Sequence, residues 1–234
     1  MISKKSQKIV AIHQPYFMPW LGFFDKVARA DIFIVLGNAT CDWQSRSVLS
    51  RNKIKTPAGA KWLTIPIHAD LKTRIKDVKI DENNNWRKDH LKTLFFNYKK
   101  AKNFSELYPL IENIYKEKFP RLINLNLEII KLFMQLLKIK TQIIYDEDLK
   151  PRGQKNDLLI DLTKKMKGNI YLSGVGAKNY IDPIKFKKAG IKVIWQDFNH
   201  PVYQQPWGKF IPNLSAIDYL FCDGRPLGKV YEKF

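Results

Sequence analysis

The sequence predicts an α/β fold, with a largely parallel sheet flanked by helices and a helical segment inserted in the middle. Short β-branched runs alternate with helical stretches near both ends of the chain, which is typical of βαβ units. Between them, about residues 86–138 carry apolar side chains at three- and four-residue spacing, the period of a helix. With 234 residues and no linker or internal repeat, we expect a single domain over residues 1–234.

The first third predicts a βαβ unit. A short apolar run over residues 9–12 favours a buried strand, and the two prolines within residues 13–19 exclude regular structure there. A helix over 20–29 and a strand over 32–36 then follow. This spacing is that of two parallel strands joined by a helix.

The middle of the chain predicts a loop, two strands and three helices. Residues 37–60 are polar and are expected to form a loop. Apolar runs favour strands over 61–67 and 75–80. Apolar stripes at helical spacing lie within residues 86–98, 107–115 and 122–137.

The last third returns to strands alternating with helices. The expected elements are strands over 142–145, 170–172 and 191–195, helices over 157–166, 183–188 and 214–222, and a small-residue turn over 173–177. Gly224 is placed to end the last helix.

The charge balance is strongly basic. Lys and Arg number 41 against 22 Asp and Glu, for a formal charge of +19. Such a surface attracts polyanions, including nucleic acid, anionic lipid headgroups and the pyrophosphate of a nucleotide sugar; a bias spread over solvated faces is the alternative. No apolar stretch is long enough for a membrane-spanning helix and no signal peptide is evident, so a cytoplasmic location is expected.

His13 is the sharpest candidate for chemistry. It stands where a buried strand ends, and ligands of open α/β sheets bind at the carboxyl ends of strands. A histidine there can serve as a general base, or it can order its own loop. His90 lies on the apolar stripe of its helix and is either catalytic or a satisfied core histidine.

Other motifs are weaker. His68 and His200 have no partner at metal-ligand spacing, and the two cysteines fit neither a disulfide framework nor a zinc site, so we expect no metal and no cofactor. The small residues from Ser173 to Lys178 could cradle a phosphate or form a plain turn. Aromatic and amide-rich patches could stack on a sugar or base or pack in the core, and they lie at 16–20, 43–44 and 203–207.

Several of these segments together resemble the WbqC-like family, over nearly the whole chain. After the second strand, residues 37–40 (Gly-Asn-Ala-Thr) depart from the acidic residue that the resemblance leads us to expect. The matching segments are 13–26, 51–55, 62–67, Trp86 with His90, 171–174, 203–205 and 210–221.

The resemblance implies a protein of O-antigen, lipopolysaccharide or related glycan biosynthesis. It implies an enzyme that transfers an acyl or aminoacyl group to the amine of a nucleotide-linked amino sugar, with His13 as general base. Asp25 would orient a cationic neighbour, and Arg51 and Lys61 would hold phosphates. The expected catalytic residues are His13, His90 and Asp25, and the expected substrate-binding residues are Gln14, Tyr16, Trp20, Lys26, Arg51, Asn52, Lys61, Ser173, Gly174, Tyr203 and Gln204.

Alternatives to this function stay open. The donor could be an acyl-CoA or an aminoacyl-tRNA, and an RNA partner would give the basic charge a purpose. A non-catalytic scaffold of a glycan pathway is a further alternative. Sequence-specific nucleic-acid binding ranks last, because no recognition-helix, zinc-finger or RNP-like pattern occurs.

Overall fold

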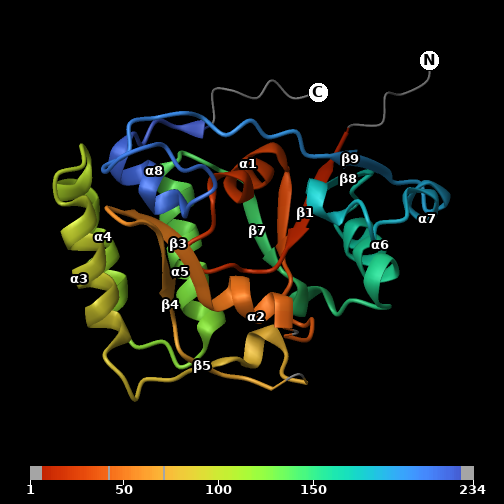
Figure 1. Cartoon of the computed structure of the whole chain (residues 1–234). Helices are drawn as coiled ribbons and strands as arrows, with labels where there is room; N and C mark the ends of the chain where they lie inside the picture. The colour runs from red at the N-terminus through yellow and green to blue at the C-terminus, as the bar shows by residue number, and fades with distance from the viewer. Residues whose placement is uncertain (1–6, 42, 71, 228–234) are drawn as a thin grey trace.

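A five-stranded parallel sheet forms the centre of the structure, with strand order β7-β2-β1-β8-β9 (Figure 1). The computed structural model describes residues 7–41, 43–70 and 72–227. The chain adds β2 and β7 on one side of β1 and then β8 and β9 on the other, so the strand order reverses between β1 and β8. The strands are β1 (Ile9–His13), β2 (Ile32–Val35), β7 (Gln142–Tyr145), β8 (Ile170–Ser173) and β9 (Lys192–Trp195).

The connection from β2 to β7 contains the inserted segment. Two antiparallel pairs, β3 with β4 and β5 with β6, precede three successive helices. Helices α3 and α4 lie at the side of the molecule farthest from β9, on the left of Figure 1. The elements are α2 (Trp43–Ser50), β3 (Arg51–Thr56), β4 (Gly59–Thr64), β5 (Ile67–His68), η1 (Ile75–Asp77), β6 (Lys79–Ile80), α3 (Trp86–Tyr98), α4 (Phe104–Lys116) and α5 (Leu122–Leu136).

Two expectations for this region were wrong. The loop expected over residues 37–60 contains helix α2 and strand β3, because the polar run of β3 is held by six consecutive pairings with β4. The two strands form a hairpin that turns at residues 57–58, and its backbone pairing needs no apolar period in β3 itself. The strand expected over 75–80 is a single turn, η1, followed by the two-residue strand β6.

The acidic group beside residues 37–40 comes from another part of the chain. Asp146 follows β7 and is buried, and its two carboxylate oxygens accept the backbone amides of Gly37 and Asn38, each at 3.0 Å. The carboxyl ends of β2 and β7 are thereby tied together.

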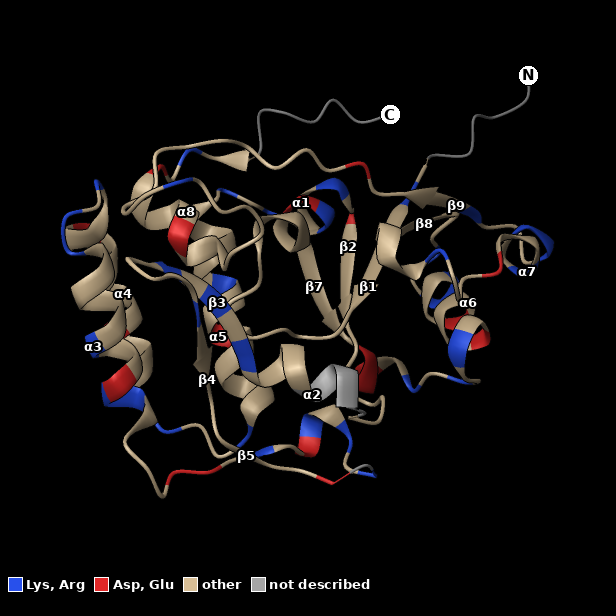
Figure 2. Cartoon of the chain, in the orientation of Figure 1, with Lys and Arg blue, Asp and Glu red and all other residues tan. Residues whose placement is uncertain are grey.

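Basic residues occur on many elements of the fold. Figure 2 shows Lys and Arg on α1, β3, α6 and α7, among others, rather than on a single element. The basic residues behind the +19 balance are thus spread over several elements of the described structure.

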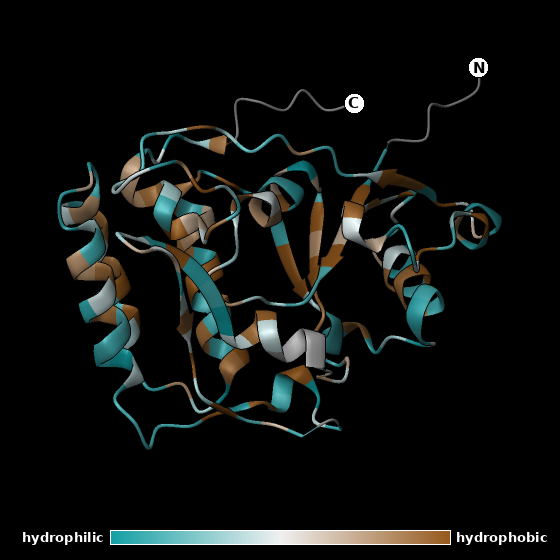
Figure 3. Ribbon diagram, in the orientation of Figure 1, coloured by the Kyte–Doolittle hydropathy of each residue, from teal (hydrophilic) through white to brown (hydrophobic). Residues whose placement is uncertain are grey.

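Helices cover both faces of the sheet, which confirms the α/β fold class. Ile9 and Ala11 pack into one core with α1, α5 and α8, whereas Val10 and Ile12 pack into a second core with α6 and α7. A sheet buried on both faces needs strands that are apolar on both sides, and the strands are brown in Figure 3. The remaining elements are α1 (Leu21–Arg29), η2 (Asp146–Leu149), α6 (Lys155–Lys165), η3 (Val175–Ala177), α7 (Pro183–Lys188) and α8 (Ala216–Cys222).

Candidate functional site

His13 is the last residue of β1, beside the point where the strand order reverses. Its half-buried ring lies on the face covered by α1, with ring centroids 5.2 Å from Phe23 and 4.5 Å from Tyr16. Nδ1 lies 2.9 Å from the carbonyl oxygen of Gln14. Because a carbonyl can only accept, Nδ1 carries the hydrogen, and the Nε2 lone pair is left to accept a hydrogen bond.

Lys26 of α1 is the second titratable group at this strand end. Only 4% of the residue is exposed, and Nζ donates to the carbonyl oxygen of Ile12 at 3.3 Å. Burial lowers the pKa of Lys26 to about 7. Burial, and then the charge of Lys26, lower the pKa of His13 to about 3. At neutral pH the imidazole is therefore neutral, and Lys26 loses its proton far more readily than an ordinary lysine.

Gly174 and Gln196 stand level with His13 at the ends of the next two strands. The registers of β1 with β8 and of β8 with β9, continued past the paired residues, place these three positions side by side. Neighbouring strands lie about 4.8 Å apart, so the backbones of His13 and Gln196 are separated by roughly 10 Å. A Cβ added to Gly174 would meet only Oε1 of Gln196, at 3.9 Å. Gly174 thus leaves the position between the two polar side chains free of a side chain.

Gln196 links the end of β9 to helix α1. Its Nε2 donates to the carbonyl oxygen of Gly22 at 2.7 Å and to Oδ2 of Asp25 at 2.6 Å. Asp25 is buried and also pairs with Nε of Arg29 at 3.0 Å, while Arg29 donates to the carbonyl oxygen of Asp197 at 2.7 Å. Asp25 therefore orients a cationic neighbour and holds the amide of Gln196 so that Oε1 remains an acceptor.

The indole of Trp20 lies on the first turn of α1. A Cβ on Gly22 would sit 2.2–2.6 Å from three carbons of that ring, so a larger residue there would force the indole to move. The ring also meets Phe198 edge-to-face at 5.4 Å. Anions often bind at the helix N-terminus that follows the first strand of such a sheet. Here that turn carries an aromatic ring.

Two asparagines fasten the loop between β1 and α1. Nδ2 of the fully buried Asn126 donates to the carbonyl oxygens of Pro15 and Leu49, each at 2.8 Å. Asn52, predicted to bind substrate, donates to the carbonyl oxygen of Met18 at 2.7 Å. These bonds fix the backbone of the segment that follows His13.

Ser173 lies on the opposite face of the sheet from His13. It alternates with Leu172 along β8 and is 1% exposed. The turn that follows forms η3, in which the amides of Ala177 and Lys178 are already bonded within the turn. Of the small-residue segment, Gly174 is therefore the part that faces the His13 side.

His90 is enclosed by the helical segment. Its Nε2 lies 3.1 Å from the carbonyl oxygen of Thr64 and its Nδ1 lies 3.1 Å from the hydroxyl oxygen of Tyr115. Burial lowers the pKa of His90 to about 4. Both ring nitrogens are engaged, and no hydrogen bond or ring contact joins it to His13 within the described residues.

The remaining predicted binding residues lie on other elements. The guanidinium of Arg51 stacks over Trp62 at 4.5 Å and donates to the hydroxyl of Ser47, and Lys61 is exposed on the same hairpin.

The Tyr203 hydroxyl donates to Asp218 at 2.7 Å inside the core, whereas Gln204 is exposed. The side chains of Trp43 and Gln44 lie outside the described part of the structure.

Sequence reasoning missed Gln196 and Arg29. Gln196 directly follows the apolar run of residues 191–195, so the strand-end argument that selected His13 applies to it equally. Arg29 stands four residues after Asp25 in a helix, the spacing of an ion pair.

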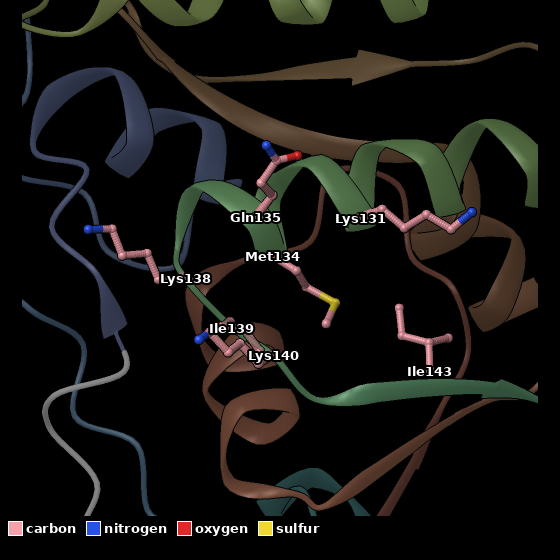
Figure 4. A pocket seen from close by; sticks show the side chains of 7 residues that line it. All are labelled: Lys131, Met134, Gln135, Lys138, Ile139, Lys140 and Ile143. Atoms are coloured by element: carbon pink, nitrogen blue, oxygen red, sulfur yellow. The ribbon is translucent and has the colours of Figure 1, made fainter.

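A hollow of about 470 Å³ lies elsewhere, between the end of α5 and the start of β7 (Figure 4). Met134, Ile139 and Ile143 form apolar lining, and lysines stand around them. None of the residues grouped around His13 lines it. In the described residues, no cluster of three or more His, Cys, Asp or Glu could hold a metal ion, and no helix is long and apolar enough to span a membrane.

Comparison of the sequence with known proteins identifies a matching family and a relative. The model of the WbqC-like protein family matches residues 14–228, beginning one residue after His13. An uncharacterized protein of Mycobacterium tuberculosis, Rv1507c, is 33% identical over 221 residues, which are 93% of this chain and 94% of the relative. No solved structure gave a significant match.

Proposed function

The chain belongs to the WbqC-like protein family, and we propose that it is a transferase that moves an acyl or aminoacyl group onto the amine of a nucleotide-linked amino sugar. The family suggests a role associated with a glycan pathway. The reaction itself is our proposal. It is supported by the polar side chains of His13 and Gln196, which lie where the strand order of the sheet reverses.

A pair of hydrogen-bond acceptors carries the proposal. His13 and Gln196 stand level on either side of Gly174, and no described residue donates a hydrogen bond to Nε2 of His13 or to Oε1 of Gln196. A primary amine offers N–H donors and one lone pair. If His13 and Gln196 accept hydrogen bonds from the two N–H groups, the lone pair of the amine stays free to attack the carbonyl carbon of the donor.

In the proposed reaction, the amine nitrogen attacks the carbonyl carbon of a thioester or an aminoacyl ester. A C–N bond forms, the bond to the thiolate or alkoxide leaving group breaks, and the amine loses one proton. His13 and Gln196 orient the amine, and Asp25 keeps Gln196 in place. Tyr16 and Trp20, half-buried aromatics at this edge, would pack against the sugar or base.

Thermal shift tests the acceptor. The protein would be screened against UDP-, GDP- and dTDP-linked amino sugars, acyl-CoAs and bulk tRNA. A ligand at 100 times its Kd adds about 2.7 kcal/mol to the stability of the folded state, which is readily measured. Stabilisation by none of the nucleotide sugars would contradict the proposal.

Turnover with the stabilising sugar then tests the site. We expect His13→Ala to lower transfer by about 100-fold or more, because the imidazole acceptor is lost. The matched control is His68→Ala, whose side chain is 63% exposed on β5 and which should keep wild-type turnover. Full turnover in His13→Ala would remove His13 from the mechanism.

A tRNA-linked donor is the second candidate, and the +19 charge favours it. Binding through phosphates releases counterions, so affinity for bulk tRNA should fall by orders of magnitude between 50 and 200 mM salt, as is typical of about 6–10 phosphate contacts. No binding at the low-salt end of that range would leave acyl-CoA as the donor to assay.

A further inference from the structure

Lys26 is a buried amine at the end of the central strand, and no carboxylate of the described residues pairs with it. Its Nζ reaches the carbonyl oxygen of Ile12, the residue before His13, and that is its one described hydrogen bond. A buried ammonium without a counter-charge is disfavoured relative to the neutral amine. We infer that Lys26 is the group that takes up the proton released by the acceptor amine, an inference that rests on the transfer function proposed above.

Among the described residues, the charged groups near Lys26 and His13 leave this amine without a neutralising partner. On α1, Asp25 is already paired with Arg29 and bonded to Gln196. The loop before α1 contributes the ring of Tyr16, which packs on His13. Strands β2, β7 and β8 contain no charged residue, and Tyr145 and Tyr171 are their titratable side chains. Lys192 on β9 is exposed at the far end of its strand.

His13 and Lys26 differ in pKa, and this difference suits them to different roles in the reaction. The pKa of His13 is near 3, so its imidazole accepts a hydrogen bond at neutral pH but holds a proton poorly. The pKa of Lys26 is about 7, which matches a base that must gain and release a proton in each cycle.

The proton balance of the step is simple. The neutral Lys26 amine takes the proton that leaves the substrate nitrogen as the C–N bond forms and becomes an ammonium. It returns that proton to the departing thiolate or alkoxide, or to solvent, after the acyl bond of the donor breaks. No other reactant is needed.

Lysine side-chain NMR measures the first requirement without a substrate. The protein would be labelled with ¹³C and ¹⁵N at lysine and titrated from pH 5 to 11, with Lys26→Met identifying the Lys26 signal. We expect the Lys26 signal to titrate near pH 7, well below the ordinary lysine value of 10.5. A Lys26 signal that titrates with the exposed lysines would overturn the inference.

Kinetics tests the role itself. Lys26→Met and Lys26→Arg should lower kcat by about 100-fold or more while keeping the thermal shift given by the nucleotide sugar, and Lys164→Arg should match wild type. In the wild type, kcat should rise with pH through a midpoint near 7, and this limb should vanish in Lys26→Arg.

The outcomes separate the two proposals. Transfer that persists in Lys26→Arg with an unchanged pH profile would overturn the role of Lys26 and leave the transferase function standing. Absence of transfer by the wild-type protein with every donor in the panel would overturn the function and the role together, even with a Lys26 signal that titrates near pH 7.

Discussion

At the scale of single residues, burial decides what the ionisable groups at the end of β1 can do. Lys26 and His13 both have a pKa far below the usual value, because each would lose hydration in the charged form. The neutral forms are compatible with burial but make the site sensitive to pH. Burial acts in the same way on His90 of α3, and two consequences for stability follow, one from Lys26 in the alkaline range and one from His90 in the acid range.

The first concerns Lys26. Its pKa falls from 10.5 to about 7 on folding, so between these values the unfolded chain binds more protons and stability rises with pH. Below pH 7 the charged amine is buried at its full cost. Lys26→Met removes this cost and should stabilise the protein at pH 7 by about 3–5 kcal/mol.

Urea denaturation at pH 6, 8 and 10 measures this effect. The gain from Lys26→Met should shrink as pH rises toward 10.5, whereas the exposed control Lys164→Met should change little at any pH. A destabilised Lys26→Met at pH 7 would show that the amine is not buried at a cost.

The second concerns His90. Its pKa falls from 6.5 to about 4 on folding, so the unfolded chain binds more protons in this window and stability is lost as pH drops from 6.5 toward 4. The pKa difference corresponds to about 3 kcal/mol for this histidine. His90→Gln should make that part of the profile less steep, with His13 supplying the slope that remains, measured by thermal unfolding from pH 4 to 7. The exposed control His68→Gln should leave the profile as in wild type, and an equally steep profile in His90→Gln would contradict the assignment.

At the scale of elements, helix α1 is shaped by the fit between Trp20 and Gly22. A methyl group at Gly22 would overlap the indole, so Gly22→Ala should destabilise the protein by about 1–3 kcal/mol through overpacking. In the background of Trp20→Ala the overlap is gone, and the same change should become neutral or favourable because alanine is the better helix former.

A double-mutant cycle in urea measures this reversal of sign. The matched control is Gly176→Ala, since nothing lies within 4 Å of a Cβ at that position, and it should be close to neutral. Equal effects of Gly22→Ala with and without the indole would disprove the packing explanation.

At the scale of the whole molecule, Asp218 joins regions far apart in the sequence. This buried carboxylate of α8 accepts the hydroxyls of Tyr98 at 2.6 Å and Tyr203 at 2.7 Å and the amide of Gln205 at 2.8 Å. The Tyr98 hydroxyl also accepts the backbone amide of Lys55 at 2.8 Å. The inserted hairpin and helix α3 are thereby bonded to the C-terminal segment.

Asp218→Asn turns one acceptor oxygen into a donor that faces other donors. We expect it to lower the free energy of unfolding by about 2–4 kcal/mol, because buried donors lose their partner. The control is Asp161→Asn on α6, whose carboxylate is 27% exposed and whose loss should cost less than about 1 kcal/mol. Similar losses in the two variants would show that the network contributes no more than a surface pair.

The sequence by itself determined the features that depend on local pattern. The β-branched runs predict the strands of the main sheet, the three- and four-residue stripes predict the inserted helices, and the prolines predict where β1 must end at His13. These are short-range properties, since periodicity and backbone restriction act within one element. The resemblance to the WbqC-like family, confirmed over residues 14–228, likewise needed only the order of residues.

Only the tertiary structure decided which strand ends meet and what each side chain faces there. It placed Gly174 and Gln196 level with His13, turned Ser173 to the other face and engaged both nitrogens of His90. It also buried Lys26 with no counter-charge among the described residues. The physical reason is that strand order, register and burial arise from contacts between residues far apart in the chain, and hydrogen bonding and pKa follow from those contacts.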